Sequence, residues 1–251
     1  MRVSVRPALL VLLAVLGACA PATVEEAAAT VRVVPGGWIE DRWVHLDGEV
    51  FALPAPPLDA DASTSGLDVI YPYVWQRYGA DGEPLARVDL PARARWIHAR
   101  PLPVVGLENG LYTEAGGLRG YPAKDAALTE DGLYWSDGEA LWRERERLLD
   151  GAFERVLVVA DRVLALERDR GVYWPGEQEI ELPTDWFAAD AAADLYLLTP
   201  TGVVWLDAEG YELATYPGRF EQIAVDATRG VWLLDDAGNV RHLTLELEET
   251  W

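Results

Sequence analysis

The chain repeats one short pattern of strands and turns from Trp38 almost to its end. An apolar, strand-like stretch reaches a turn rich in Gly, Asp and Glu, and a second such stretch follows, often closing with Leu-Pro or Tyr-Pro. Asp-Gly between apolar stretches predicts a hairpin, because glycine adopts the positive φ that tight turns require. Proline then ends the strand, since it has no N–H to donate. The repeated turns are Asp47-Gly48-Glu49, Asp81-Gly82-Glu83, Gly116-Gly117, Asp137-Gly138-Glu139, Gly176-Glu177, Glu209-Gly210 and Ala237-Gly238.

The spacing of these turns predicts the architecture. Their glycines lie on average about 32 residues apart, a period typical of repeat folds. A further strand precedes most hairpins, as residues 163–166 precede Gly171, so each unit holds three or four strands. Residues 143–149 are the best helix candidate, but they are few and could extend a strand. Small antiparallel sheets in tandem predict an all-β fold, a single β-propeller with only short, protected edges. Seven blades are favoured and six are possible, because the unit is short for a blade.

One stretch resembles known propeller repeats. Residues 206–213, Leu-Asp-Ala-Glu-Gly-Tyr-Glu-Leu, resemble the Leu-Asp-x-x-x-Gly-x-x-Leu turn of quinoprotein-like and regulator-type propellers, with one residue missing. The general pattern is similar over roughly residues 38–249, and the resemblance implies the same fold. The first unit is short and the last lacks a fourth strand. Residues 31–34, Val-Arg-Val-Val, could therefore close the ring by pairing with the last sheet.

The N-terminus carries an export signal. Arg2 and Arg6 precede an apolar run over residues 8–16, which has the length of a secretory signal and is too short to span a bilayer. Ala18-Cys19-Ala20 fits ordinary signal cleavage. The new N-terminus would then be Pro21, whose ring and missing N–H suit a peptidase poorly. The alternative stretch, Leu16-Gly17-Ala18-Cys19, resembles the lipobox of bacterial lipoproteins.

The lipobox resemblance implies a membrane anchor. It implies a thioether-linked diacylglycerol on Cys19, cleavage before that residue and fatty acylation, such as palmitate, of the new amino group. Two or more acyl chains hold a protein stably at a bilayer. We therefore expect a signal peptide over residues 1–18, a flexible tether over 19–35 and the propeller over 36–251. Ala20 favours the outer membrane if the host has one, and otherwise the outer face of the cytoplasmic membrane.

Charge and cysteine content exclude several functions. The formal net charge is -21, and removal of residues 1–18 takes away two arginines and no acid, giving -23. Such acidity argues against binding nucleic acid or anionic lipid, because both require a basic surface. Cys19 is the only cysteine, so lipidation would leave no thiol for disulfides, thiolate zinc sites or nucleophilic attack.

Catalytic groupings are sparse. The three histidines, His45, His98 and His242, lie in separate strand-like segments without metal-ligand spacing, and there is no nucleophile elbow or P-loop. Residues 59–63, Asp-Ala-Asp-Ala-Ser, resemble half of a calcium loop, but Thr64 and Ile70 replace the expected Gly and Glu. We therefore predict a solvated acidic loop there, with no catalytic residue, metal site or cofactor.

Tryptophan and arginine give the remaining candidates. Recurrent tryptophans are expected to pack neighbouring blades together, and these are Trp135, Trp174, Trp205 and Trp232. Others fall outside that position and could stack on a sugar or peptide, namely Trp38, Trp96, Trp186 and Trp251. The one basic concentration could meet an anionic ligand, or pair with carboxylates if it lies on strands. It consists of Arg87, Arg93, Arg95 and Arg100.

Together these features predict a lipid-anchored, extracytoplasmic propeller that acts as a non-enzymatic binding or scaffolding module, with an envelope protein as partner. Two alternatives stay open. One is an enzyme, a lyase or hydrolase, whose site at the central channel would gather carboxylates, His and Arg from several blades. The other is a carbohydrate- or small-ligand-binding propeller, in which exposed tryptophans would converge on one face.

Overall fold

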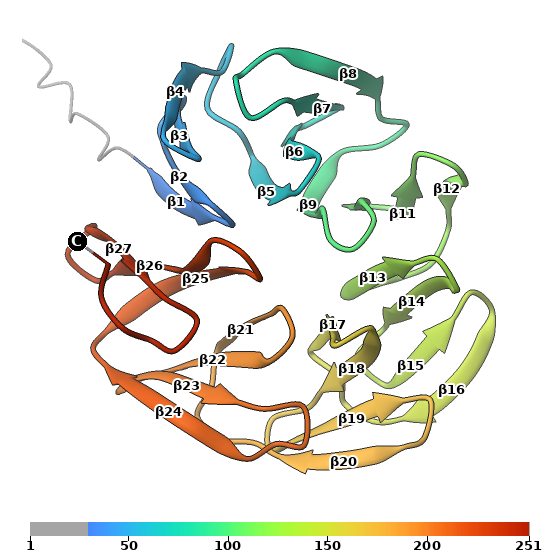
Figure 1. Ribbon diagram of the computed structural model, residues 1–251. Coiled ribbons are helices and arrows are strands. Elements are labelled where there is room, and N and C mark those ends of the chain that lie inside the picture. The colour runs from blue at the N-terminus through green and yellow to red at the C-terminus, as the bar shows by residue number, and fades with distance from the viewer. Residues whose placement is uncertain (1–29, 251) are drawn as a thin grey trace, which may run out of the picture.

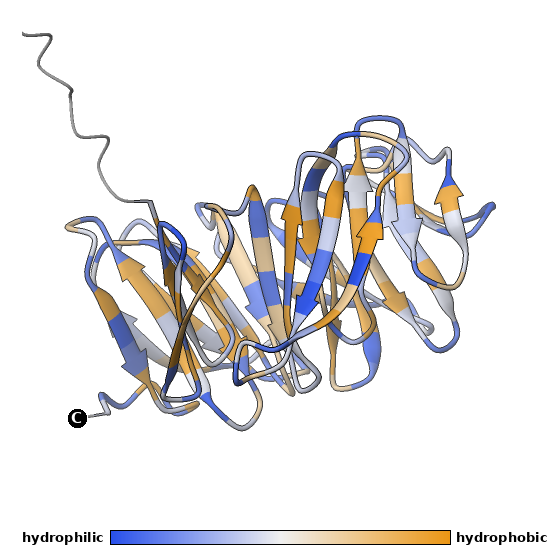
Figure 2. Cartoon of the chain, turned by 90° about the horizontal axis from the view of Figure 1, so that it is seen from above, coloured by the Kyte–Doolittle hydropathy of each residue, from blue (hydrophilic) through white to orange (hydrophobic). Residues whose placement is uncertain are grey.

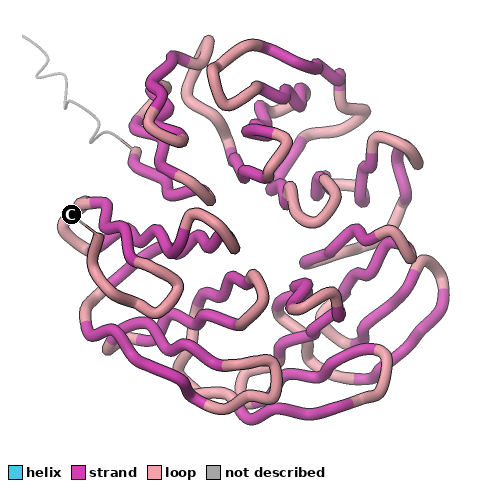
Figure 3. The backbone as a smooth tube through the Cα atoms, viewed as in Figure 1, coloured by secondary structure: helices cyan, strands magenta, loops and turns pink. Residues whose placement is uncertain are grey.

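Seven antiparallel sheets form a closed ring around a central channel (Figure 1). The computed structural model describes residues 30–250, so the lipobox with Cys19, the first part of the tether and Trp251 lie outside the described residues. The described chain consists of strands and loops (Figure 3), and none of it is a helix that could cross a membrane. The prediction of an all-β, seven-bladed β-propeller is confirmed.

Six blades have four strands and the last has three, each following the chain order as a meander. The strands of blades 1 to 4 are β1 Val31–Val34, β2 Gly37–Glu40, β3 Trp43–Leu46, β4 Glu49–Ala52; β5 Asp59–Ser63, β6 Gly66–Tyr71, β7 Val74–Tyr78, β8 Pro84–Asp89; β9 Ala94–His98, β10 Val104–Leu107, β11 Gly110–Thr113, β12 Gly117–Arg119; β13 Asp125–Thr129, β14 Gly132–Ser136, β15 Ala140–Arg143 and β16 Glu146–Asp150. Those of blades 5 to 7 are β17 Arg155–Val159, β18 Arg162–Leu166, β19 Arg170–Trp174, β20 Gln178–Glu181; β21 Ala188–Ala191, β22 Leu195–Thr199, β23 Gly202–Leu206, β24 Glu212–Pro217; β25 Phe220–Asp226, β26 Gly230–Asp235 and β27 Val240–Leu243.

The first strand of each blade lines the channel and the later strands lie progressively outward (Figure 1). Hydrophobic and hydrophilic residues alternate along many strands (Figure 2), because successive side chains point to opposite faces of a sheet. The apolar core is therefore divided into clusters between neighbouring blades. Between blades 1 and 2, for example, Ile39 and Val44 pack with Ala62, Leu67 and Val69.

Two expectations about the strands need correction. Residues 31–34 were expected to pair with the last sheet, but β1 pairs with β2 as the innermost strand of blade 1. The ordered ring therefore includes residues upstream of the expected boundary at residue 36. Within residues 30–250, blade 7 has three strands and no fourth, as predicted. Residues 143–149 enter β15 and β16 and form no helix.

The recurrent tryptophans do pack between blades, but at two positions and not one. Trp135 and Trp232 lie on second strands, whereas Trp174 and Trp205 lie on third strands. Trp174 contacts the cluster between blades 4 and 5, and Trp205 the cluster between blades 6 and 7. The repeat is less regular than the sequence pattern indicates, because either face of a blade serves this packing: Trp135 and Trp174 face the preceding blade, and Trp205 and Trp232 face the following one.

Tight turns bring some backbones too close for a side chain. Gly66 begins β6 with φ +127°, and a Cβ there would lie 2.0 Å from the carbonyl oxygen of Tyr78 on the neighbouring strand. Neither the conformation nor the contact suits another residue.

We expect Gly66→Ala to destabilise the propeller by about 2 kcal/mol or more, because the substituted residue combines unfavourable φ with a backbone clash. Urea unfolding followed by tryptophan fluorescence measures this change. Gly120→Ala is the matched control, since no atom lies within 4 Å of its added Cβ. Equal effects of the two substitutions would contradict the account.

Candidate functional site

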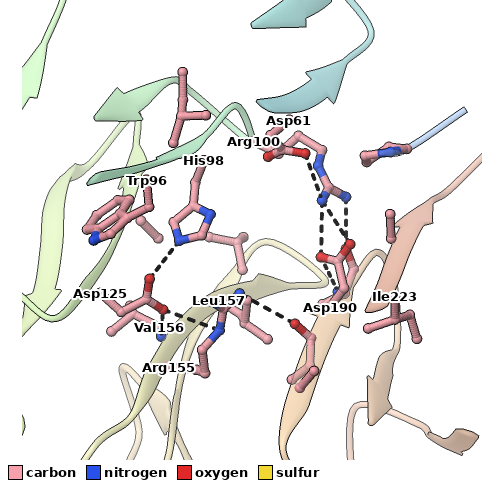
Figure 4. A pocket seen from close by; sticks show the side chains of 18 of the residues that line it. Asp61, Trp96, His98, Arg100, Asp125, Arg155, Val156, Leu157, Asp190 and Ile223 are labelled. Carbon is pink, nitrogen blue, oxygen red and sulfur yellow. Dashed lines mark hydrogen bonds and ion pairs between the residues drawn. The ribbon is translucent and has the colours of Figure 1, made fainter. Parts of the chain in front are cut away.

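A cavity of about 880 Å³ occupies the central channel and is lined by the first strands of all seven blades. Eight acidic side chains and four Lys or Arg side chains line it, with Trp96, His98 and Phe187. A cavity of this size matches the small-molecule sites of other proteins. What the channel can do depends on how its charged groups are engaged (Figure 4).

Aspartates on the innermost strands accept hydrogen bonds from the backbone of the next blade. The N–H of Ile97 donates to Asp59 at 2.9 Å, and the N–H of Ala99 donates to Asp61 at 2.7 Å. The same bond recurs from Val156 to Asp125 at 2.8 Å, between blades 4 and 5. It recurs again from Val225 to Asp190 at 2.7 Å, between blades 6 and 7. Each carboxylate thus joins its own blade to the backbone of its neighbour.

The other junctions are joined by longer side chains. Arg32 donates to Asp59 between blades 1 and 2, and His98 Nε2 lies 2.6 Å from Asp125 Oδ1 between blades 3 and 4. Between blades 5 and 6, Arg155 donates to the carbonyl of Ala189 at 3.4 Å. Gln222 closes the ring between blades 7 and 1, bonding Val33 N–H at 3.2 Å and Val31 O at 3.3 Å. Every blade junction therefore has a polar contact at the channel.

Arg100 crosses the channel. It lies between β9 and β10 and donates to both oxygens of Asp190, at 3.1 and 3.0 Å, and to the carbonyl of Val225. Asp61 lies 3.5 Å away, so one guanidinium connects blades 2, 3, 6 and 7. Burial alone would lower the pKa of Arg100, but Asp190 and Asp61 hold it above its ordinary value. The buried charge is therefore compensated.

Asp125 is the second centre of the channel. It accepts from His98 and from Val156, and its Oδ2 lies 3.5 Å from Nε of Arg155. Burial would raise the pKa of Asp125, but Arg155, His98 and the Val156 N–H together lower it below its ordinary value. At Asp59, by contrast, burial outweighs Arg32 and the Ile97 N–H, so its pKa is raised.

The predicted basic concentration is dispersed. Arg87 lies on the exposed face of blade 2, 3.6 Å from Asp89, and Arg93 lies 3.9 Å from Glu108. Arg95 is exposed, whereas Arg100 enters the channel. Arg87, Arg93 and Arg100 therefore lie near carboxylates, and Arg100 alone of the four reaches the cavity.

The predicted tryptophan surface does not form among the described residues. Trp38 stacks on His45 at 4.4 Å and contacts Trp232, while Trp186 is buried and donates to the carbonyl of Glu167. Trp96 alone of these candidates lines the cavity, 4.8 Å from His98. The three histidines also lie in different places. His45 and His242 stack on tryptophans, and only His98 reaches the channel.

The acidic stretch at residues 59–63 is neither a calcium loop nor a solvated loop. It forms β5, and Asp61 is 9% exposed. The prediction of a loop is wrong because Arg32, Arg100 and two backbone N–H groups compensate the carboxylates on an innermost strand. Sequence reasoning also missed Asp125 and Asp190. A signal was present, since Asp-Ala recurs where each of these strands lies, at residues 59–60, 61–62, 125–126 and 190–191.

The channel groups bind one another and leave a polar cavity around them. Among residues 30–250, no three His, Cys, Asp or Glu side chains converge in an arrangement that could hold a metal ion. His98 and Asp125 form the one His–carboxylate pair in the cavity lining. Such a pair can orient an imidazole for acid–base chemistry.

Comparison with known proteins defines the fold. No protein-family model matches the chain, and no curated protein matches its sequence. The structure is similar to apo AztD from Citrobacter koseri, with a TM-score of 0.51 and 12% identity over 89% of this chain and 85% of that one. It also matches BamB from Moraxella catarrhalis (TM-score 0.46, 13% identity, 86% and 79% covered). PorZ from Porphyromonas gingivalis, a surface component of the type-IX secretion system, has a TM-score of 0.45 and 13% identity, with 74% of this chain and 32% of that one covered. At these identities the likeness to AztD indicates a shared propeller fold only.

We expect Arg100→Met to destabilise the propeller by about 3 kcal/mol, because Asp190 and Asp61 would lose their counter-charge inside the channel. Differential scanning calorimetry measures the change. Arg95→Met, at an exposed position, should alter stability by less than about 0.5 kcal/mol. Combining Arg100→Met with Asp190→Asn should cost less than the sum of the two single changes, and strict additivity would argue against a direct interaction.

The lowered pKa of Asp125 predicts a pH dependence of stability. A carboxyl with a depressed folded-state pKa stabilises the protein above its unfolded pKa, about 3.9, and loses this contribution as the pH falls through the folded value. Wild type should therefore have a higher Tm than Asp125→Asn at pH 7, and the difference should shrink below about pH 4. A difference that stays constant down to pH 2 would contradict this assignment.

Proposed function

We propose that this chain is a lipid-anchored, extracytoplasmic propeller that acts as a non-enzymatic binding or scaffolding module in the bacterial cell envelope. Lipid on Cys19 attaches it to a membrane, and an envelope protein is its partner. The outer membrane is the site if the host has one, and otherwise the outer face of the cytoplasmic membrane. Nucleic acid is excluded as a partner by the net charge of -21.

The observation that carries the binding role is the engagement of the channel groups. Asp61, Asp125 and Asp190 each accept a backbone N–H from the next blade, and Arg100 contacts two of these three. Such groups rigidify the ring and hold one another in place. A rigid ring of sheets presents loops and strand edges on its outside, which is the surface that a scaffolding role uses.

The anchor is supported by the sequence and by the length of the segment before the ring. Leu16-Gly17-Ala18-Cys19 resembles a lipobox, and the described chain enters blade 1 at Val31. Eleven residues, 20–30, lie between them, so the propeller would work within about 40 Å of the bilayer surface. Because the domain is acidic, the acyl chains would supply the membrane affinity.

One observation favours the alternative of an enzyme in the channel. His98, Asp125 and Arg155 come from three different blades and meet in a cavity of about 880 Å³, as a site at the channel requires. Asp125 already accepts from His98 and from Val156, so this pair also joins blades 3, 4 and 5. That structural role accounts for the contacts without a reaction, and the binding module remains our conclusion.

Cys19→Ala tests the proposal. We expect the variant to move from the membrane fraction to the soluble fraction and to lose incorporation of labelled palmitate, because the sulfur that carries the diacylglycerol is gone. Ala20→Ser, which keeps the cysteine, is the control and should stay with membranes. If Cys19→Ala still sediments with membranes and incorporates label, the lipoprotein proposal fails.

A further inference from the structure

In the part of the chain that the structure describes, blade 7 has one strand fewer than its neighbours. The outer edge of β27 is bridged only where Leu243 faces Glu249, and Thr250 N–H donates to the carbonyl of His242 at 3.2 Å. Within residues 30–250, no strand pairs with the rest of that edge, at Val240 and Arg241. In the other six blades a fourth strand occupies this position.

The missing strand leaves part of blade 1 uncovered. Trp38, His45 and Val50 are cross-strand partners and so lie on one face of blade 1, with Trp43 two residues before His45. Trp38 contacts Trp232 of β26, so this face looks toward blade 7 (Figure 1). Its outer part is open to solvent, since Trp43 is 48% and Val50 58% exposed.

Complete blades cover the same face of the blade that follows them. Val172 and Trp174 on the third strand of blade 5 pack with Leu148 and Leu149 of β16, the fourth strand of blade 4. Between blades 5 and 6, Val204 and Leu206 pack with Ile180 of β20 in the same way. Trp43, on the third strand of blade 1, therefore lacks the cover that a fourth strand gives in complete blades. Val50, on the fourth strand, is exposed much as Leu85 on β8 (55%) and Leu213 on β24 (48%) are.

The charges around this opening are mainly acidic. Glu40 and Asp41 of blade 1 are exposed, and so are Asp236 and Glu248 of blade 7. Of the basic side chains close by, Arg241 lies 3.3 Å from Glu249 and Arg42 lies over the ring of Trp43, while Arg219, whose carbonyl accepts from Asp236 N–H, is exposed. A basic segment would complement this rim.

We propose that the blade 7–1 seam, meaning the outer edge of β27 with Trp43, His45 and Val50, binds an extended segment of a partner protein. The segment adds a fourth strand to blade 7 through backbone hydrogen bonds. Alternate side chains are apolar and cover Trp43 and Val50, while the Lys or Arg between them point to the opposite face of the added strand, the side on which Arg241 and Glu249 lie. The inference rests on the proposed binding function and names the class of partner for it.

The test uses the full-length protein in detergent micelles and a fluorescent nine-residue peptide, Lys-Val-Arg-Val-Lys-Leu-Arg-Val-Lys, followed by fluorescence anisotropy. We expect saturable binding that Val50→Asp weakens about tenfold or more. The matched control is Leu213→Asp on β24 of the complete blade 6, where Leu213 is 48% exposed, and it should leave affinity unchanged. N-methylation of alternate peptide bonds should abolish binding, because it removes the donors that strand addition needs.

Several outcomes would overturn the proposal. Absence of saturable binding, or equal losses from Val50→Asp and Leu213→Asp, would exclude the seam. Equal affinity for a scrambled peptide would show that charge alone binds. If the peptide binds only after residues 20–29 are deleted, the chain's own tether is the occupant. If Val50→Asp dissociates a dimer in sedimentation and the peptide does not compete, the occupant is a second copy. The Cys19→Ala experiment reports on the lipid anchor alone. Failure of peptide binding at the seam can therefore be told apart from failure of the lipoprotein proposal.

Discussion

The ring depends on hydrogen bonds between the aspartates of one blade and the backbone of the next. A propeller has no central core, because its axis is a channel, so each junction must be fixed by what lies between two blades. Apolar packing supplies area at every junction but does not specify how far one innermost strand slides along the next. A carboxylate that accepts a hydrogen bond from one particular backbone N–H does specify this register. Asp61, which accepts from Ala99 N–H, is an example.

Arg100 makes this arrangement tolerable electrostatically. Asp61 and Asp190 face the same channel from opposite sides of the ring, and ionised carboxylates in a partly buried space require compensation. The guanidinium of Arg100 provides it, because its Nη2 donates to both oxygens of Asp190. The same side chain also fixes blade 3 against blades 6 and 7. The side chain of Arg100 therefore both compensates the buried carboxylates and helps to close the ring.

The junction between blades 7 and 1 is built differently from the rest. Its channel contact is the neutral side chain of Gln222, and Arg229 pairs with Asp47 at 3.0 Å farther along it. The inner half is therefore closed by polar contacts and by Trp38 on Trp232, while the outer half lacks a covering strand. The fold thus places a set of charged groups at the channel, where they hold the ring together, and leaves Trp43 and Val50 uncovered at this seam. Function on a propeller lies in such sites and not in the fold itself.

The sequence by itself determined most of the strands and turns, and it favoured seven blades over six. Gly and Pro act locally, so their recurrence reported the period correctly even though two of the turns, at Gly138 and Gly238, join second to third strands and the others join third to fourth. The same local pattern foretold that the last blade is short. Only the tertiary structure decided which side chains meet in the channel. Asp125 bonds a residue 31 positions along the chain, and Arg100 bonds one 90 positions away. Closure of the ring brings these groups together, and no local preference of Asp59, Arg100 or residues 31–34 specifies which strand will become their neighbour.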